Sequence, residues 1–182
     1  MKRIIITGVS IIIILTIATL IRNNKLNIDK ELMNVMRSHK TFVIDDNNKA
    51  KFNKLFVPKE YTYIDLDGDK KNELVVLTND YSGEYVILRY FNRKVYGYRV
   101  GARSFLDLKE DGTFMRSGSA YESTISRIEF VNNDLNYIDI VTYDTENKKY
   151  TVDNKEVNRD ELNKYLTEWN NKKSKEFITI KK

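Results

Sequence analysis

The chain contains no cysteine, and only one proline and one histidine occur among its 182 residues. Without cysteine the protein forms no disulfide, thiolate metal site, cysteine nucleophile or lipid-modified N-terminal cysteine. Such a composition fits a protein that folds outside the cell without oxidative help. His39 would have to serve any Ser-His-Asp triad, but its place beside Lys40 at the end of a predicted helix favours a solvated or capping role.

Several catalytic signatures are also missing. The sequence has no Gly-x-Ser-x-Gly elbow, no phosphate-binding P-loop and no His-Glu-x-x-His zinc helix. Hydrolysis by a pair of carboxylates stays open because Asp and Glu are plentiful, although the sequence alone selects no pair. We therefore predict no catalytic residues.

The net charge of +5 is unevenly distributed along the chain. Residues 1–25 contribute +4 and residues 172–182 contribute another +4, whereas residues 26–171 carry 22 basic and 25 acidic side chains. A nucleic-acid groove would place its positive charge on the folded face, so we expect no nucleic-acid partner. The basic tail could lie on anionic lipid or wall polymer, or Phe177, Ile178 and Ile180 could add an edge strand or fray.

Residues Ile4 to Ile21 form an uninterrupted run of 18 uncharged, mostly apolar residues. As a helix the run spans about 27 Å, close to the thickness of a bilayer core. Because it is longer than a usual signal-peptide core, we predict a retained single-pass anchor over residues 1–25, with residues 26–182 as an extracellular domain. Thr16-Ile17-Ala18 keeps a cleaved signal peptide open, and a buried core helix is a third interpretation.

Apolar spacing predicts helices at both ends of this outer domain. A helix over residues 28–38 would place four apolar residues on one face, and residues 49–56 are predicted as a second short helix that ends at Pro58. Near the C-terminus, Asn158 and Glu161 form a capping box. The apolar stripe that follows must pack on the sheet; it consists of Leu162, Tyr165, Leu166 and Trp169.

Between these helices the pattern changes to strands joined by short turns. We predict strands at residues 41–44, 61–64, 73–78, 84–91, 95–100, 104–108, 113–116, 126–131, 135–143 and 150–152. Turns such as Asn132-Asn133-Asp134 make hairpins of consecutive strands. The predicted fold class is α+β: an antiparallel β-sheet meander flanked by N- and C-terminal helices, preceded by one N-terminal transmembrane or signal helix.

The stretch from Asp65 to Glu73 is the most informative part of the sequence. Its acidic residues occupy positions 1, 3, 5 and 9 of a loop between two predicted strands. This spacing turns several carboxylates toward one centre, where their mutual repulsion favours a hard cation such as calcium. We predict a structural calcium site formed by the side chains of Asp65, Asp67, Asp69 and Glu73 and by the backbone carbonyl of Lys71.

The loop resembles the shorter calcium loops of exported repeat proteins more than an EF-hand. Position 12 is Val76, where an EF-hand needs a bidentate Glu, and position 6 is Lys70, where Gly usually allows a positive φ. We expect weak binding, with a dissociation constant on the order of 10⁻⁴–10⁻³ M. A plain Asp-rich β-turn is the alternative interpretation.

Several segments together resemble a group of exported or membrane-anchored proteins of clostridia and related Firmicutes. The resemblance covers residues 27–170 and rests on the order of its motifs. The motifs are Lys40-Thr41-Phe42, Tyr63 to Asp69 with Glu73 to Val76, Lys94 to Tyr98, Leu108 to Phe114, Ser117-Gly118 and Val152 to Val157. The resemblance implies an exported protein with an Asp-rich, calcium-type loop and implies no known activity.

Two further features are candidates for ligand binding. The loop with Ser117, Gly118, Ser119 and Tyr121 combines small residues with hydroxyl groups, so a ligand could approach its backbone, although it also fits an ordinary loop between strands. Five tyrosines could form a sugar- or peptide-binding face or could pack half-buried on the sheet. They are Tyr81, Tyr85, Tyr90, Tyr96 and Tyr98.

These features favour a cell-surface binding or interaction module that is stabilised by calcium and held by the membrane through residues 4–21. A cell-envelope polymer or a protein is the expected partner. An extracytoplasmic hydrolase that uses carboxylates, and an inhibitor or immunity-type protein, are the alternatives. Cleavage of the N-terminal segment would instead give a secreted protein.

Overall fold

The computed structural model describes residues 19–20, 22–23, 25, 27–38, 40–44, 50–55, 57–79 and 83–181. Residues 27–38 form a helix. The elements that follow are β1 (Lys40–Ile44), β2 (Ala50–Leu55), β3 (Pro58–Ile64), β4 (Glu73–Thr78), β5 (Tyr85–Phe91), β6 (Lys94–Val100), η1 (Ala102–Ser104), β7 (Phe114–Ser117), β8 (Glu122–Val131), β9 (Asp134–Asp144), β10 (Lys149–Val152), β11 (Lys155–Glu156), α2 (Arg159–Asn170) and β12 (Ile178–Thr179).

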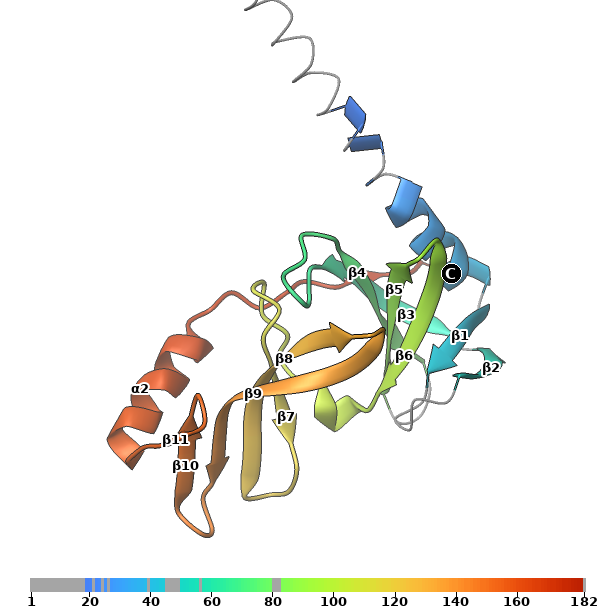
Figure 1. The fold of residues 1–182 in the computed structure, drawn as a ribbon. Coiled ribbons are helices and arrows are strands. Elements are labelled where there is room, and N and C mark those ends of the chain that lie inside the picture. The colour runs from blue at the N-terminus through green and yellow to red at the C-terminus, as the bar shows by residue number, and fades with distance from the viewer. Residues whose placement is uncertain are drawn as a thin grey trace, which may run out of the picture.

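The strands form two sheets. One has seven strands in the order β12-β3-β4-β5-β6-β1-β2, and the other has five in the order β11-β10-β9-β8-β7 (Figure 1). Mostly antiparallel sheets with helices agree with the predicted α+β class, but the prediction of one meandering sheet is wrong. β1 also runs parallel to β6, with Phe42 opposite Tyr96, so the first sheet is not a pure meander.

Residues 49–56, predicted as a helix, contain strand β2 instead. Apolar residues three apart fit a helix, but strand pairing decides the structure, because β2 lies antiparallel to β1 with Leu55 opposite Lys40. Pro58 therefore ends no helix. It opens β3, and the start of a strand is a position where a missing N–H is tolerated.

The predicted strand at residues 104–108 is also wrong in its extent. This segment holds the end of η1 and a single bridge between Leu106 and Met115. Asp107 adopts a positive φ of 45°, which interrupts any extended run. Asp tolerates the left-handed region better than most residues do, so no glycine is needed here to mark the break in the sequence.

The predicted hairpins across residues 92–94 and 132–134 are confirmed, and a third hairpin, β10–β11, which was not predicted, shares their turn conformation. β5–β6, β8–β9 and β10–β11 are antiparallel pairs, and each turns through two residues of positive φ. Two left-handed residues match the twist of the flanking strands, and Asn and Asp suit them well. The turn residues are Asn92-Arg93, Asn132-Asn133 and Asp153-Asn154.

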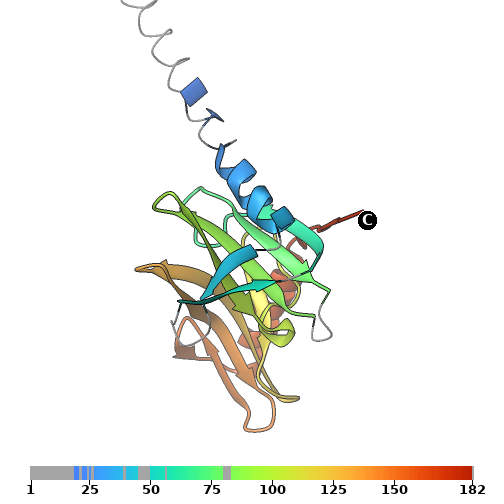
Figure 2. The same cartoon turned by 90° about the vertical axis from the view of Figure 1, so that its right-hand side faces the viewer.

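The first sheet is covered on both faces, as β4 shows. Leu74 and Val76 point to one face and Val75 to the other, and all three are fully buried. Leu74 and Val76 belong to the same cluster as Leu32 of the N-terminal helix. Val75 belongs to the cluster that includes Phe114 of the second sheet. The helix and the second sheet therefore pack on opposite faces of the first sheet (Figure 2).

Helix α2 covers the outer face of the second sheet. The predicted capping box is confirmed: the Asn158 side chain accepts the N–H of Glu161, and the Glu161 carboxylate accepts the N–H of Asn158. Leu162 and Trp169 of the predicted stripe are buried in one cluster with the sheet. Trp169 Nε1 also donates to Thr113 Oγ1 at 2.9 Å, which ties the end of α2 to the start of β7.

The C-terminal tail then returns to the side of the molecule that carries the N-terminal helix (Figures 1 and 2). β12 pairs with β3, with Ile178 opposite Tyr61, and the N–H of Ile180 donates to the carbonyl of Lys59 at 3.0 Å. The tail therefore adds an edge strand to the first sheet, which is one of the alternatives predicted for it.

Candidate metal centre

The Asp-rich loop joins β3 to β4 and is shaped by hydrogen bonds from its own backbone. β3 and β4 pair up to Ile64 and Glu73, which leaves residues 65–72 to reverse the chain. The Asp65 carboxylate accepts the N–H groups of Gly68 and Lys70, each at 2.8 Å. The backbone therefore wraps around this carboxylate, as it commonly does around Asp in turns.

Two residues of the loop adopt a left-handed backbone: Gly68 with φ 80° and Lys70 with φ 67°. Lys70 thus holds the conformation for which similar loops use Gly, at a cost of about 1 kcal/mol. The sequence departure at this position costs some stability but leaves the loop closed around Asp65.

Three of the predicted ligands converge. One carboxylate oxygen from each of Asp65, Asp67 and Glu73 lies within 4.8 Å of the others, so this acidic triad could hold a metal ion. Asp69 lies outside the triad, because its Oδ1 accepts the N–H of Lys71 at 2.7 Å and its Oδ2 pairs with the Lys71 ammonium at 2.9 Å. The backbone N–H and the side-chain ammonium of Lys71 are thus both directed at Asp69.

Glu73 is the most buried member of the acidic triad. It is 2% exposed, and its Oε2 accepts the N–H of Leu66 at 3.0 Å. Burial, together with the charges of Asp67 and Asp69, raises the pKa of Glu73 to about 8, although the Leu66 N–H and Arg89 favour the ionised form. Burial also raises the pKa of Asp67. Without a bound cation, burial therefore favours the protonated form of Glu73.

Arg89 brings a positive charge to this site, and its role was not predicted. Its Nη2 lies 3.3 Å from Asp67 Oδ2 and 4.0 Å from Asp69 Oδ2, and its Nε lies 3.8 Å from Glu73 Oε1. The guanidinium also lies 4.2 Å from the centre of the Phe130 ring in the second sheet. A signal was present in the sequence, because an Arg inside the apolar strand β5 needs a buried partner.

The charge balance of the site stays negative even with Arg89 in place. Asp65, Asp67 and Glu73 face one guanidinium, and Asp69 is paired with Lys71. A divalent cation would compete with Arg89 for Asp67 and with a proton for Glu73. Both forms of competition weaken binding, in line with the weak affinity expected of the loop.

A second turn packs directly on the Asp-rich loop. Gly112 has φ 81°, and a Cβ there would lie 3.0 Å from the carbonyl oxygen of Asp65, so Gly is required. Asp111 in the same turn pairs with the Lys172 ammonium at 2.7 Å. The loop is therefore supported by the segment before β7 and, through it, by the segment after α2.

The predicted ligand loop forms the connection between β7 and β8. Ser117 donates its hydroxyl to the carbonyl of Ser119, whose own hydroxyl accepts the N–H groups of Tyr121 and Glu122. A Cβ on Gly118 would lie 3.0 Å from the Glu122 carboxylate. The hydroxyl groups thus shape the turn itself, while Tyr121 is 55% exposed. Ligand binding by this loop stays a prediction.

The tyrosines of β5 and β6 are largely internal. Tyr98 is buried in the cluster between the two sheets, and Tyr85 and Tyr96 pack against that cluster. Tyr90 packs against the cluster under the N-terminal helix. Packing on the sheet is thus confirmed for these four residues, whereas Tyr81 lies outside the described residues.

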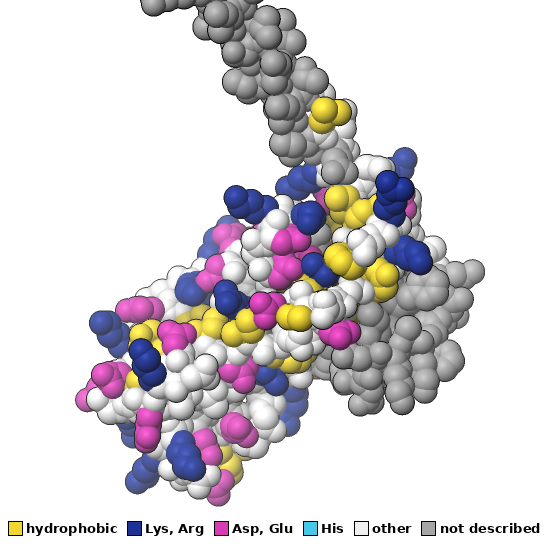
Figure 3. Space-filling model, in the orientation of Figure 1, with side chains coloured by type: hydrophobic (Ala, Val, Ile, Leu, Met, Phe, Trp, Pro, Cys, Tyr) yellow, Lys and Arg dark blue, Asp and Glu magenta, His cyan; other side chains and the backbone are white. Residues whose placement is uncertain are grey.

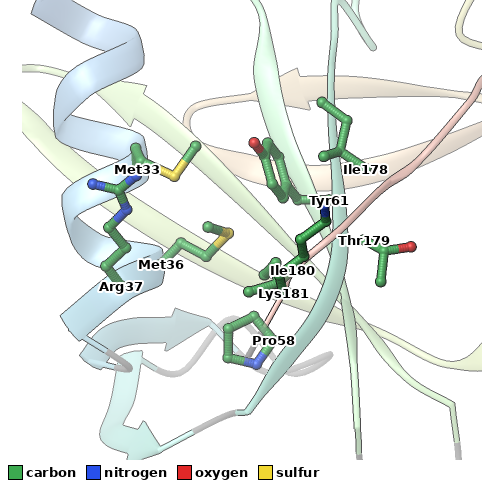
Figure 4. Close-up of a pocket in the computed structure, with 9 residues that line it drawn as sticks. All are labelled: Met33, Met36, Arg37, Pro58, Tyr61, Ile178, Thr179, Ile180 and Lys181. Carbon is green, nitrogen blue, oxygen red and sulfur yellow. The ribbon is translucent and has the colours of Figure 1, made fainter.

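A pocket of about 310 Å³ lies between the N-terminal helix, β3 and the C-terminal tail. Met33 and Met36 line one side and Ile178 and Ile180 the other, with Tyr61 from β3 (Figure 4). Hydrophobic side chains on the surface near the helix gather among Lys and Arg side chains (Figure 3). The described residues that line this pocket include no carboxylate.

Comparison of the chain with protein-family models, with curated proteins and with solved structures finds no match. The resemblance to exported proteins of Firmicutes therefore stays a hypothesis. Among the described residues, no helix combines the length and apolar character that a membrane span requires. His39 and nearly all of the predicted anchor at residues 4–21 lie outside the described residues.

Proposed function

We propose that the protein is a binding or interaction module of the cell surface, held by an N-terminal anchor and stabilised by a structural calcium ion in the β3–β4 loop. The observation that carries the proposal is the convergence of Asp65, Asp67 and Glu73 at the junction of two core strands. Three carboxylates at this distance repel one another unless a cation or a proton intervenes.

Calcium matches the chemistry of the acidic triad better than other common cations. The donors are carboxylate oxygens, which favour hard cations, and the triad contains neither His nor Cys, the ligands that favour zinc. Calcium accepts six to eight oxygen ligands in irregular geometry, so backbone carbonyls and water can complete its shell. Magnesium demands a near-octahedral shell and gives up its water reluctantly.

A bound ion would act on the fold rather than on a substrate. Asp65 directly follows β3 and Glu73 begins β4, so one ion would join the ends of two central strands. Glu73 is 2% exposed and Arg89 is 9% exposed, which leaves a substrate little access to either group. A general acid must reach its substrate, so the same burial favours a structural role over carboxylate-dependent hydrolysis.

The anchor and the extracellular location rest on the sequence. The uncharged run of residues 4–21 is long enough to cross a bilayer core, and the absence of cysteine fits a domain that folds outside the cell. A calcium loop of low affinity is useful in that setting, because extracellular modules bind calcium with dissociation constants on the order of 10⁻⁴–10⁻³ M.

Calcium titration of the full chain in neutral detergent, followed by thermal unfolding, tests this proposal. We expect several millimolar calcium to stabilise the protein by about 1–2 kcal/mol, because the ion binds the folded state alone. For a chain of this size that corresponds to a rise of roughly 2–8 °C in melting temperature. The variant Asp67→Asn should lose most of this rise, since it removes one member of the triad.

The matched control is Asp153→Asn, which alters an exposed Asp in the β10–β11 turn. The control should keep the full response to calcium. A melting temperature that does not respond to calcium would refute the structural ion, and so would a response that Asp67→Asn retains.

A further inference from the structure

A second pocket, of about 390 Å³, lies between the β9–β10 hairpin and α2, which are neighbours in Figure 1. Tyr143 and Tyr150 line it from the hairpin, where the strand register places them directly opposite each other. Leu162 and Leu166 line it from one face of α2. The volume suits a small molecule, and the lining combines apolar and polar surface in similar amounts.

The pocket is positively charged. Lys148, in the turn between β9 and β10, and Arg159, the first residue of α2, both line it, and none of its lining residues is acidic. Within the described part of the chain, neither side chain has an ion pair or a hydrogen-bond partner. Two cations from separate elements thus line one pocket without a carboxylate partner among the described residues.

Acidic residues on the same elements do not line the pocket. Asp144 accepts the N–H groups of Glu146 and Asn147 and the side-chain amide of Asn147, all within its own turn. Glu161 accepts the N–H of Asn158 in the capping box. Because these carboxylates are engaged locally, they leave Lys148 and Arg159 unpaired.

The pocket also offers neutral polar groups beside its aromatic rings. The side-chain amide of Asn163 and the hydroxyl of Tyr150 have no partner among the described residues. Such groups donate to and accept from hydroxyl groups of a ligand. Tyr143 and Tyr150 supply aromatic rings on which a sugar can pack, and the free hydroxyl is that of Tyr150, because the Tyr143 hydroxyl donates to Met115 Sδ at 3.9 Å.

We propose that this pocket binds a phosphorylated sugar. Lys148 and Arg159 would bind the phosphate, Asn163 and the Tyr150 hydroxyl would bind ring hydroxyls, and the two tyrosine rings would pack on the sugar. This inference deepens the proposed binding function by naming a ligand class, and the calcium loop takes no part in it.

Isothermal titration calorimetry of the full chain in neutral detergent tests the inference with three probes: glucose 6-phosphate, glucose and inorganic phosphate. We expect glucose 6-phosphate to bind at least tenfold more tightly than either of the other probes. Each of those probes lacks one half of the contacts, and the loss of a single charge-assisted hydrogen bond changes affinity by about that factor.

Paired substitutions separate the pocket from the general surface charge. The pocket pair, Lys148→Gln with Arg159→Gln, should weaken binding of glucose 6-phosphate by at least tenfold. The control pair, Lys149→Gln with Lys164→Gln, removes the same charge from the same hairpin and helix at exposed residues that do not line the pocket. The control pair should stay within threefold of the unmodified protein, and both pairs should keep its melting temperature.

Each of the following outcomes would overturn the inference. One is the absence of binding heat with glucose 6-phosphate up to tens of millimolar, and another is an equal loss in the control pair. Equal affinity for inorganic phosphate and glucose 6-phosphate would exclude the sugar contacts. If the pocket pair unfolded, Asn163→Ala alone should still weaken glucose 6-phosphate binding by at least threefold, and an unchanged affinity would count against the inference.

Because the calcium titration reports on the β3–β4 loop, failure of the sugar-phosphate test leaves the calcium proposal standing, and the reverse also holds.

Discussion

Glu73 governs the electrostatics of the β3–β4 loop because its carboxyl group lies inside the protein. The β4–β5 register pairs Leu74 with Leu88, so the next residue of β5, Arg89, falls beside Glu73. The guanidinium is 3.8 Å from the Glu73 carboxylate, too far for a hydrogen bond. Arg89 therefore attenuates, but does not cancel, the cost of burying a charged Glu73.

Stability in the absence of divalent ions should fall as the pH rises. The pKa of Glu73 is raised from 4.5 to about 8, so the folded protein holds a proton that the unfolded chain releases between these values. The stabilising effect is complete below the unfolded pKa and is lost as the pH passes through the folded pKa. A shift of this size corresponds to a loss of roughly 2–5 kcal/mol, measurable by denaturant unfolding with a chelator from about pH 5 to 9.

The variant Glu73→Gln should flatten this profile, because an amide cannot titrate. Glu129→Gln, on an exposed position of β8, is the control and should keep the slope. Added calcium should reduce the slope for the unmodified protein, since the ion binds the ionised carboxylate and releases the proton. A profile that is equally steep in Glu73→Gln would assign the pH dependence to other groups.

At this scale the sequence predicts the acidic residues but not their partners. Asp65, Asp67 and Glu73 converge as their spacing suggests, because the loop reverses the chain between paired strands. Asp69 fits the same spacing, yet a local ion pair with Lys71 draws it away. Arg89 is 22 positions from Asp67, and only the strand register brings the two together. Spacing along a loop is a local property, whereas register is set by the whole sheet.

Among the elements, α2 is held by a small number of specific contacts. Its N-terminus is closed by Asn158 and Glu161, and its C-terminal turn is fixed by the hydrogen bond from Trp169 to Thr113. Lys109 adds a third tie, because its buried ammonium lies 4.6 Å from the centre of the Trp169 ring and donates to Ser174 at 3.2 Å. The N-terminal end is thus closed locally, and the C-terminal end is fastened to distant parts of the chain.

Removal of the N-cap should weaken the protein by a measurable amount. Asn158→Ala leaves two N–H groups at the start of α2 without their side-chain acceptor, and we expect a loss of about 1 kcal/mol. Asn170→Ala, at the exposed last residue of the same helix, is the matched control and should change stability by less than about 0.5 kcal/mol. Urea unfolding followed by Trp169 fluorescence measures both; equal effects would show that the cap contributes nothing specific.

Elements with a local signal in the sequence are predicted well, whereas β2, which is fixed by pairing alone, is not. The turns at Asn92 and Asn132 and the Asn158 capping box carry their signals within two to four residues, so they are predicted. β2 is a strand because β1 pairs with it, and β1 is held in turn by a parallel pairing with β6. That parallel contact joins residues more than fifty positions apart, a relation that apolar spacing cannot reveal.

Taken as a whole, the molecule is layered around one shared core. The N-terminal helix, the first sheet, the second sheet and α2 succeed one another, and the central cluster draws residues from both sheets. Tyr98 of the first sheet also donates its hydroxyl to the carbonyl of Asn133 in the second sheet at 2.7 Å. Ile125 and Ile128, three residues apart on β8, belong to different clusters, so β8 packs toward α2 on one face and toward the first sheet on the other.

Because the central cluster is shared, the two sheets should unfold together. Phe114 is fully buried on β7, and its ring centre lies 4.4 Å from that of Phe105. Phe114→Ala should therefore cost about 3–5 kcal/mol, and it should do so equally for both sheets. Trp169 fluorescence reports on the second sheet and α2, while hydrogen exchange of β4 amides reports on the first sheet.

The control is Val131→Ala, at a half-exposed position of β8, which should cost less than about 1 kcal/mol by both probes. If Phe114→Ala destabilised the region around Trp169 but left β4 exchange unchanged, the sheets would be separate folding units, and residues 26–182 would not be one domain.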